Sequence, residues 1–446
     1  MTTDNPRTDL QYKREVFKAS SLDMPVLCPG DGPHFSWIDP DGTRVASSGE
    51  AAVIETNGAA RFTDASLQAA RLYSRVSAQG EGELLPLLVG GFAFSDQQQV
   101  GGCWRGFPAL RLLLPREQWI CRDGWITRFS LKGEAAAASP FTGLPLTGAP
   151  AGQVADAVMA DARAEDFRHW ASRVELAQAA MREGELDKVV LSRWSHGERQ
   201  RPDLKALLTR LARQRPACFT FALEHTGALL LGSSPELLAS LTREKPSRRR
   251  LRSVALAGSA PRATDPGEDR AAATALMSCA KNRREQALVV EALVAGFEEL
   301  VLSPEYDDRP SLLALPEAWH LGTAISSPAD ELDSLLSAVD TLHPSPAVCG
   351  TPREPARAII EASEERGWYT GGVGWMDSRG DGQFAVVLRA ALYRDGALLR
   401  HAGAGILPGS TAELEWQECE AKLRAMSPVD GRDATDRKPR DEQHAA

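Results

Sequence analysis

Apolar residues recur along this chain with two different spacings, which together predict a fold that contains both helices and strands. Between Phe167 and Met181 they return every three or four residues, as on the buried face of a helix. The same spacing predicts a long helix over 269–300 and a final helix over 411–426. Shorter apolar runs rich in β-branched residues, such as 188–193, predict strands.

Turn residues divide other apolar runs into pairs of strands. Residues 227–238 are typical of a strand, a tight turn and then a second strand or a helix. Residues 383–401 predict a hairpin closed by Arg394-Asp395-Gly396, a sequence that favours a type I′ turn. Strands dominate and do not alternate regularly with helices. We therefore expect an α+β fold with large, mainly antiparallel β-sheets flanked by helices.

Composition also changes along the chain. Residues 133–153 are rich in small residues, proline and glycine, which indicates a linker or a long surface loop. The last residues are polar. We expect an N-terminal scaffold over 1–150, a catalytic region over 151–427 and a disordered tail over 428–446.

The overall charge limits the kinds of partner. The 446 residues have a net charge of −9 and are 43% hydrophobic, so we expect a globular chain with no general attraction for nucleic acid or membranes. The basic stretch 244–252 is expected to be a solvated hairpin tip, the alternative being an anion-binding patch. A small anionic ligand would need positive charge gathered locally.

Cysteine spacing and the N-terminus indicate the compartment. The seven cysteines include no CxxC pair, so neither a disulfide framework nor a structural zinc site is expected. The N-terminus lacks the pattern of a signal peptide, and no apolar run approaches the ~20 residues that span a bilayer. We expect a cytoplasmic protein, and a monomer because no heptad or interaction helix is evident.

Charged residues on the final predicted helix form a first candidate site. Glu415, Glu418 and Lys422 share one face of that helix. Alone, they indicate a solvated face that holds an ion pair. However, Gly403 and Gly405 precede the helix, and glycine-rich backbone can approach an anion closely. The two carboxylates also suit Mg²⁺, which takes one or two of them and completes its shell with water and ligand oxygens.

Four other residues could carry acid–base or anion chemistry. Lys188 would act as a base if it were buried, and Glu236 in an apolar pocket would keep its proton and act as an acid. The sequence does not decide between these roles and two ordinary surface residues. Arg389 follows a strand and could grip a carboxylate with two hydrogen bonds. A lone histidine such as His320 is more often structural.

Ten segments, in family order, resemble the chorismate-utilising enzymes. This family includes isochorismate synthases, salicylate synthases and the large subunits of anthranilate and aminodeoxychorismate synthases. One such motif would be weak evidence, whereas ten in order are specific. The segments are DKVVLSR (187–193), GSSPELL (232–238), ALAGSAPR (255–262), SCAKNRREQALVV (278–290), WHLGTAI (319–325), LHPSPAVCGTP (342–352), YTGGVGWMD (369–377), FAVVLRAALY (384–393), HAGAGIL (401–407) and EWQECEAKL (415–423).

The resemblance implies a role for each candidate. Lys188 looks like the base that activates water for attack on ring carbon 2 of chorismate, and Glu236 like the acid that protonates the hydroxyl leaving carbon 4. Glu285 and Glu418 look like ligands of Mg²⁺, with Glu415 close by. The residues that resemble the family's substrate-binding set are Arg389, Lys422, Gly403, His320, Ala347, Tyr369 and Ser259.

Ala347 favours one branch of the family. Synthases of anthranilate, aminodeoxychorismate and salicylate usually carry threonine at this position, whereas the HPxPAV pattern seen here resembles isochorismate synthases. The resemblance therefore implies an Mg²⁺-dependent isomerase that converts chorismate to isochorismate for menaquinone or siderophore biosynthesis. A salicylate synthase, a non-catalytic chorismate-binding protein and an unrelated metal-dependent hydrolase remain alternatives.

The chain departs from the family pattern beside Glu285. The family commonly has an aspartate and a histidine where this chain has Asn282 and Gln286. We expect the hydrogen bonds around the metal site to be altered there.

Overall fold

The structure, a computed structural model, describes most of the chain. Within the described part, no helix is both long enough and apolar enough to cross a membrane. The predicted linker over 133–153 and the predicted tail over 428–446 lie outside that part. The described residues are 9–19, 32–97, 101–132, 167–198, 202–245 and 247–425.

These residues form eight helices and twenty strands. The helices are α1 (Arg61–Tyr73), α3 (Phe167–Arg182), α4 (Leu204–Gln214), α5 (Pro266–Ser278), α6 (Ala280–Glu299), α7 (Leu335–Leu342), α8 (Arg353–Ser363) and α9 (Ala412–Ala425). The strands are β1 (Leu10–Lys18), β2 (His34–Ile38), β3 (Arg44–Thr56), β4 (Val76–Gln79), β5 (Leu88–Phe92), β6 (Leu110–Arg122), β7 (Trp125–Leu131), β8 (Lys188–Glu198), β9 (Phe219–His225), β10 (Ala228–Ser234), β11 (Leu237–Lys245), β12 (Arg248–Pro261), β13 (Glu305–Tyr306), β14 (Ser311–Ala314), β15 (Ala318–Pro328), β16 (Gly350–Thr351), β17 (Gly372–Met376), β18 (Gly382–Val386), β19 (Ala390–Arg394) and β20 (Ala397–Ile406).

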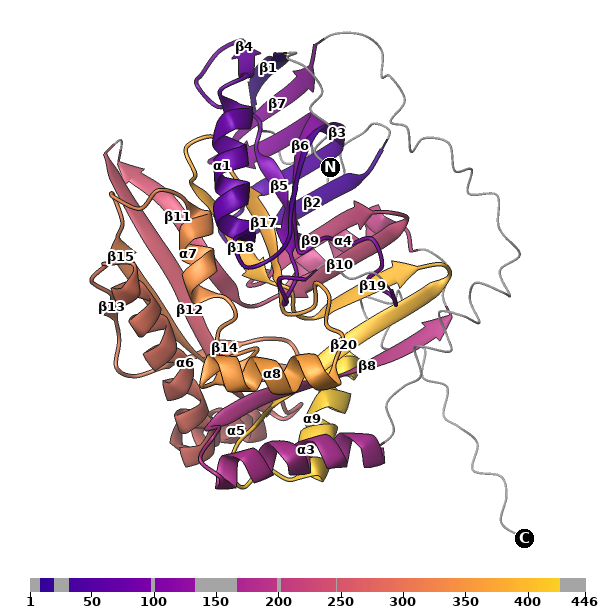
Figure 1. Ribbon diagram of the computed structural model, residues 1–446, viewed down its shortest axis with the longest axis vertical. Helices are drawn as coiled ribbons and strands as arrows, with labels where there is room; N and C mark the ends of the chain where they lie inside the picture. Colours follow the sequence, from indigo (N-terminus) through magenta and orange to yellow (C-terminus); the bar gives the residue numbers. More distant parts are fainter. Residues whose placement is uncertain are drawn as a thin grey trace.

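The strands form one connected sheet that divides at β6 into two arms (Figure 1). The first arm continues through β3, β2, β9, β10, β19, β20, β8 and β16. The second arm continues through β5, β17, β18, β11, β12 and β15, with β13 and β14 along its outer edge. Among the described strands, β1 and β4 alone pair in parallel. The predicted α+β fold with mainly antiparallel sheets is confirmed.

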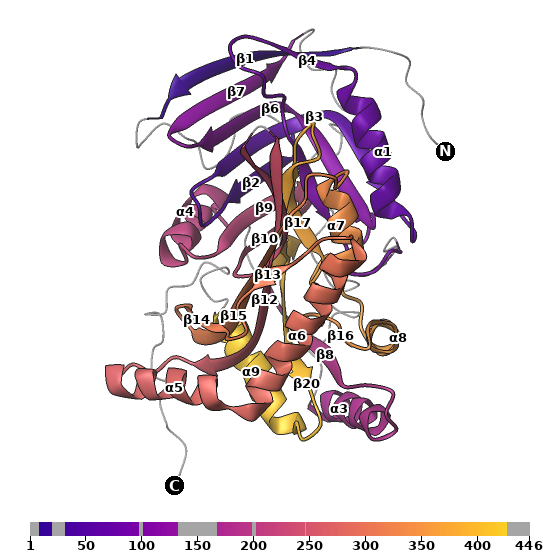
Figure 2. The same cartoon turned by 90° about the vertical axis from the view of Figure 1, so that its left-hand side faces the viewer.

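Alternation along the strands builds a core on each face of the first arm. In β10, Ala228 and Leu230 belong to the larger hydrophobic cluster, whereas Leu229 and Leu231 belong to a second cluster under α3, α4, α8 and α9. Because both faces are covered, this strand is apolar at successive positions. Figure 2 shows α1, α7 and α6 in a row on the side of the second arm, where they cover the larger cluster.

The single helix predicted over 269–300 is wrong, because the structure has two helices there. α5 ends at Ser278 and α6 begins at Ala280, since Cys279 between them has an extended backbone with φ −68° and ψ 115°. No proline or glycine marks this break in the sequence. The break turns α6 along β12 and β15 and brings Glu285, in its first two turns, to the sheet.

The hairpin predicted over 383–401 is confirmed at its turn but not along its first strand. Asp395 and Gly396 have φ +51° and +78°, as a type I′ turn requires, and they connect β19 with β20. However, β18 ends at Val386 in the second arm and β19 begins at Ala390 in the first. The short segment between them carries the chain from one arm to the other.

A substitution at Gly91 can test the close packing where β5 pairs with β17. A Cβ at Gly91 would overlap the Gly372 carbonyl oxygen and lie 2.7 Å from the Trp368 ring. We expect Gly91→Ala to destabilise the fold by about 1–3 kcal/mol through overpacking, which lowers the midpoint of urea unfolding. Gly101→Ala is the matched control, since a Cβ there meets nothing within 4 Å. Equal midpoints of urea unfolding for the two variants would contradict the close packing between β5 and β17.

Candidate active site

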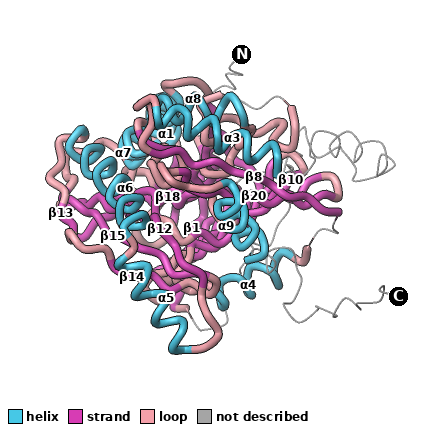
Figure 3. The backbone as a smooth tube through the Cα atoms, turned by 90° about the horizontal axis from the view of Figure 1, so that it is seen from below, coloured by secondary structure: helices cyan, strands magenta, loops and turns pink. Residues whose placement is uncertain are grey.

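The candidate active site is a pocket between the two arms, at the places where the chain crosses from one arm to the other. Residues 235–236 connect β10 with β11, and residues 387–389 connect β18 with β19. Figure 3 shows α6 and α9 on either side of the same region. The pocket is lined by Val190, Pro235, Glu236, Leu256, Ala257, Gly258, Ser259, Glu285, His320, Ala347, Val348, Tyr369, Thr370, Leu388, Arg389, Gly403, Gly405, Glu418 and Lys422.

The structure brings the predicted site residues together. Ten of the twelve line this one pocket: Glu236, Ser259, Glu285, His320, Ala347, Tyr369, Arg389, Gly403, Glu418 and Lys422. The other two lie just behind the lining. Lys188 is beneath Glu285, and Glu415 faces Lys281 of α6.

Lys188 owes its position to the alternation of side chains along β8. Val189 and Leu191 belong to the hydrophobic cluster under α3, so Lys188 and Val190 point to the opposite face, where the pocket lies. Lys188 is completely buried, and its Nζ lies 3.1 Å from Glu285 Oε1. A buried ammonium is strongly destabilising without a counter-ion, so this carboxylate stabilises the lysine whenever it is protonated.

Gly405 on the adjacent strand leaves the space for this ion pair. β20 pairs with β8, with Gly405 opposite Val190. A Cβ at Gly405 would overlap Glu285 Oε1 and lie 3.2 Å from Lys188 Cε. Any larger residue would therefore push the lysine and the glutamate apart.

Glu236 brings an acidic group into the pocket from the first crossover. Its backbone is fixed by a 3.1 Å hydrogen bond from Val386 N to its carbonyl oxygen. Burial raises the pKa of its carboxyl to about 8, against the smaller opposing effects of Lys188 and Arg389. Glu236 is therefore protonated at neutral pH and can donate a proton.

Two carboxylates on α9 complete a set of three lysine–glutamate pairs. Lys422 Nζ lies 2.6 Å from Glu418 Oε1, and Lys281 Nζ lies 2.7 Å from Glu415 Oε1. Partial burial would raise the pKa of Glu418, but the nearby Lys422 outweighs it and holds that pKa below its usual value. Glu418 is therefore ionised at neutral pH.

Arg389 and His320 add further polarity to the pocket. Arg389, at the second crossover, has φ +48°, a left-handed conformation that is uncommon for a residue with a Cβ. Burial, followed by Arg389 and Lys422, lowers the pKa of His320 to about 3, so the ring is neutral. Its Nε2 is buried and has no hydrogen-bond partner among the described residues. That nitrogen is free to meet a ligand.

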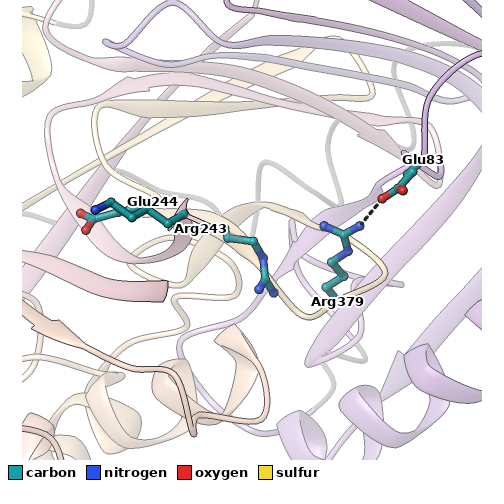
Figure 4. Close-up of a pocket in the computed structure, with 5 residues that line it drawn as sticks. Glu83, Arg243, Glu244 and Arg379 are labelled. Atoms are coloured by element: carbon teal, nitrogen blue, oxygen red, sulfur yellow. Dashed lines mark hydrogen bonds and ion pairs between the residues drawn. The ribbon is translucent and has the colours of Figure 1, made fainter. Parts of the chain in front are cut away.

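A larger and more open groove lies elsewhere, near the tip of the β11–β12 hairpin (Figure 4). Its volume is about 580 Å³, against about 80 Å³ for the pocket between the arms. However, Arg379 pairs with Glu83 at 3.2 Å and Arg243 with Asp381 at 3.4 Å. These charges largely neutralise one another at the surface, which fits the predicted solvated hairpin tip. We therefore assign the chemistry to the smaller pocket, where buried acidic and basic groups converge.

The family comparison agrees with this geometry. A model of the chorismate binding enzyme family matches residues 24–429. This chain belongs to that family. The resemblance indicated by the ten motifs is confirmed.

Individual relatives cover much of the chain. The isochorismate synthase MenF of Bacillus subtilis is 30% identical over 424 residues, which are 89% of this chain and 87% of the relative. The isochorismate synthase DhbC of the same organism is 38% identical over 273 residues, or 59% and 67% of the two chains. The solved structure of MenF, the menaquinone-specific isochorismate synthase from Escherichia coli, is 24% identical, with a TM-score of 0.70 over 93% of this chain and 94% of that one. This last likeness shows the common fold.

Gln286, which departs from the family pattern, supports the wall of the pocket. Its Oε1 accepts a 2.8 Å hydrogen bond from Ala257 N, and its Nε2 donates to Ala255 O and Thr323 Oγ1, both at 3.1 Å. These bonds tie α6 to β12 and β15. Among the described residues none of these bonds reaches Glu285, so this amide shapes the pocket wall without contacting the carboxylate beside it.

Sequence reasoning assigned no role to three residues that support the site from behind. Arg366 donates 2.6 Å hydrogen bonds to the carbonyl oxygens of Val190 and Val348, which both line the pocket. Lys281 lies in one of the quoted motifs, and Glu317 lies two residues before the first residue of another. Their proximity to the motifs was the available signal, but their partners are distant in sequence.

Proposed function

We propose that this protein is an isochorismate synthase, which adds water at carbon 2 of chorismate and releases the hydroxyl group from carbon 4. The observation that carries the proposal is that one site holds both a buried lysine, Lys188, and a glutamic acid that keeps its proton, Glu236. Attack by water and departure of a hydroxyl require a base and an acid at the same ring. The printed names of the relatives support the same reaction.

Lys188 and Glu236 would divide the proton transfers. Lys188, whose nitrogen is shielded from solvent, would act in its neutral form and take a proton from the attacking water. Glu285 Oε1, 3.1 Å away, would stabilise the ammonium that results. Glu236 would give its proton to the departing hydroxyl, so that water leaves. The proton that Lys188 gains balances the proton that Glu236 loses. Both groups would exchange protons with solvent before the next turnover.

The cationic side chains would hold the two carboxylates of chorismate. Arg389 can form two parallel hydrogen bonds with one carboxylate. Lys422 is fixed by a 2.7 Å hydrogen bond from its Nζ to Gly403 O, at the pocket wall. Together they would orient the ring between Lys188 and Glu236. The other proposed contacts come from His320, Tyr369, Ser259 and Ala347.

Magnesium would be held by Glu285 and Glu418. Both line the pocket and offer carboxylate oxygens, the donors this ion prefers, and it commonly takes one or two of them. The described residues include no group of three acidic, histidine or cysteine side chains placed to hold a metal, so substrate and water would complete its shell. Glu415, engaged with Lys281, would act from an outer position. When bound, the ion would neutralise negative charge on the substrate.

Ala347 supports isomerisation without a further elimination. It lines the pocket in the loop after α7 and presents a methyl group. The branches that eliminate pyruvate usually carry a threonine there, whose hydroxyl would add a hydrogen-bonding group beside the ring. Without it, the reaction would stop at isochorismate, which supplies menaquinone or siderophore biosynthesis.

The decisive test is product analysis. The purified protein would be incubated with chorismate, without ammonia, in the presence or absence of Mg²⁺, and the products separated by chromatography. Isochorismate formed only with Mg²⁺ is the expected result. Salicylate with pyruvate would instead assign a salicylate synthase, and bound but unconverted chorismate would assign a non-catalytic binding protein.

Lys188→Met tests the base. Methionine fills similar volume but cannot accept a proton. We expect kcat, measured at a temperature where the melting curve shows the variant to be folded, to fall by about 10²–10⁴-fold. Lys205→Met, at an exposed position of α4, is the matched control and should keep full activity. A kcat near the parental value for Lys188→Met would exclude this residue as the base.

The pH dependence tests the acid. Because the pKa of Glu236 is raised to about 8, the group is protonated below that pH and loses its proton above it. We therefore expect kcat/KM for chorismate to decline as pH rises through 8, approaching about tenfold per pH unit on the alkaline side. A profile that stays flat between about pH 7 and pH 9.5 would contradict the assignment of Glu236 as the acid.

Glu418→Gln tests the metal site. The amide keeps the shape of the side chain but loses the charge that attracts the cation, so the Mg²⁺ concentration for half-maximal activity should rise at least about tenfold. Calorimetric titration with Mg²⁺ gives a second measurement that does not depend on turnover. Glu413→Gln, at an exposed position of the same helix, should match the parent. Identical titrations for Glu418→Gln and the parent would remove Glu418 from the ligand set.

A further inference from the structure

Arg389 is accompanied by a carboxylate that lies outside the pocket lining. Arg389 Nε lies 3.6 Å from Glu317 Oε1, and Arg215 Nη1 lies 3.2 Å from the same oxygen. Both oxygens of Glu317 are buried and accept no hydrogen bond from the described residues. Glu317 is therefore a counter-ion shared by two buried arginines, one in the pocket and one behind it.

We propose that Glu317 is a positioning residue for substrate binding, which holds the Nε edge of Arg389 so that the two terminal nitrogens face the pocket. The inference rests on the proposed function for the identity of the anion, chorismate. Glu317 itself does not line the pocket, so it would act only through Arg389.

The shape of the guanidinium explains why this contact matters. A guanidinium can grip a carboxylate along its side, with Nε and one terminal nitrogen, or at its end, with both terminal nitrogens. Glu317 lies beside Nε, which leaves the end of the group for the ligand. The left-handed backbone of Arg389 fixes where its side chain begins, and the 3.6 Å ion pair with Glu317, which is not a hydrogen bond, restrains its far part. The group is thereby oriented before the substrate arrives, which lowers the entropy cost of binding.

Arg215 prevents Glu317 from cancelling the charge that the substrate needs. A single buried glutamate beside a single arginine would leave no net charge. Here two arginines share one carboxylate, so the cluster keeps a net positive charge for a ligand carboxylate. The backbone of Glu317 is also fixed, since its carbonyl oxygen accepts a 3.2 Å hydrogen bond from Arg262 N.

Steady-state kinetics with chorismate test this role. We expect Glu317→Gln to raise KM by about tenfold, while kcat stays within about threefold of the parent, because the amide weakens the hold on Arg389 without touching Lys188 or Glu236. Glu331→Gln is the matched control. It makes the same change of charge at an exposed position outside the pocket lining, so its KM should stay within about twofold of the parent.

A double-mutant cycle separates positioning from a merely structural role. If Glu317 acts through Arg389, adding Glu317→Gln to Arg389→Gln should raise KM no further. If Glu317→Gln raised KM by the same factor in the parent and in the Arg389→Gln variant, the inference would be overturned. If Glu317→Gln does not fold, Glu317→Asp keeps the buried charge but shortens its reach. It should then raise KM in the parent and leave KM unchanged in Arg389→Gln, and a parental KM would overturn the inference.

The parent enzyme distinguishes this inference from the function on which it rests. If the parent converts no chorismate, the proposed function and this inference both fail. If the parent converts chorismate and Glu317→Gln has the same KM, only the role of Glu317 is overturned.

Discussion

The buried pair between Lys188 and Glu285 is the interaction on which the site depends. A lysine without solvent exposure can carry its charge only with a carboxylate within contact distance, and here that carboxylate comes from α6, almost 100 positions later in the chain. The pair in turn requires Gly405 on β20, since a Cβ there would occupy the space of the carboxylate. One strand, one helix and one glycine are therefore fixed relative to one another by a single ion pair.

Charge in the pocket follows a common pattern. Each of the three carboxylates near the proposed metal site has its own lysine, namely Lys188 for Glu285, Lys281 for Glu415 and Lys422 for Glu418. A protein with a net charge of −9 thus presents a locally balanced site. A dication and a dianion can enter such a site together without leaving a large unpaired charge, because their own charges cancel.

The two crossovers between the arms explain why acid and anion-binding groups meet. A strand that stays within one arm presents its side chains to the faces of that arm, whereas a crossover places its residues between the arms. Glu236 and Arg389 lie on the two crossovers, and the unusual backbone of Arg389 belongs to one of them. Hydrogen bonds from outside the pocket then hold the backbone around these two residues. Arg366 donates to the carbonyl oxygens of Val190 and Val348, and Gln286 accepts from Ala257 N.

The sequence by itself determined the fold class, the family and ten of the residues that line the pocket. The apolar run 188–193 predicted a strand beginning at Lys188, and the motifs connected Glu236, Glu285 and Glu418 before any geometry was known. Local patterns suffice for the fold class because side-chain periodicity follows directly from backbone geometry. The family and the site residues came instead from the resemblance of the ten motifs to the chorismate-utilising enzymes.

Tertiary structure alone decided the break at Cys279, the interruption of the strand before Ala390, and the partners of Lys281 and Glu317. Neither the break nor the interruption is marked by proline or glycine in the residues concerned. Burial, which sets the protonation of Glu236, was equally invisible. Each of these features depends on residues far apart in the sequence that meet only after the two arms have formed, so no local pattern records them.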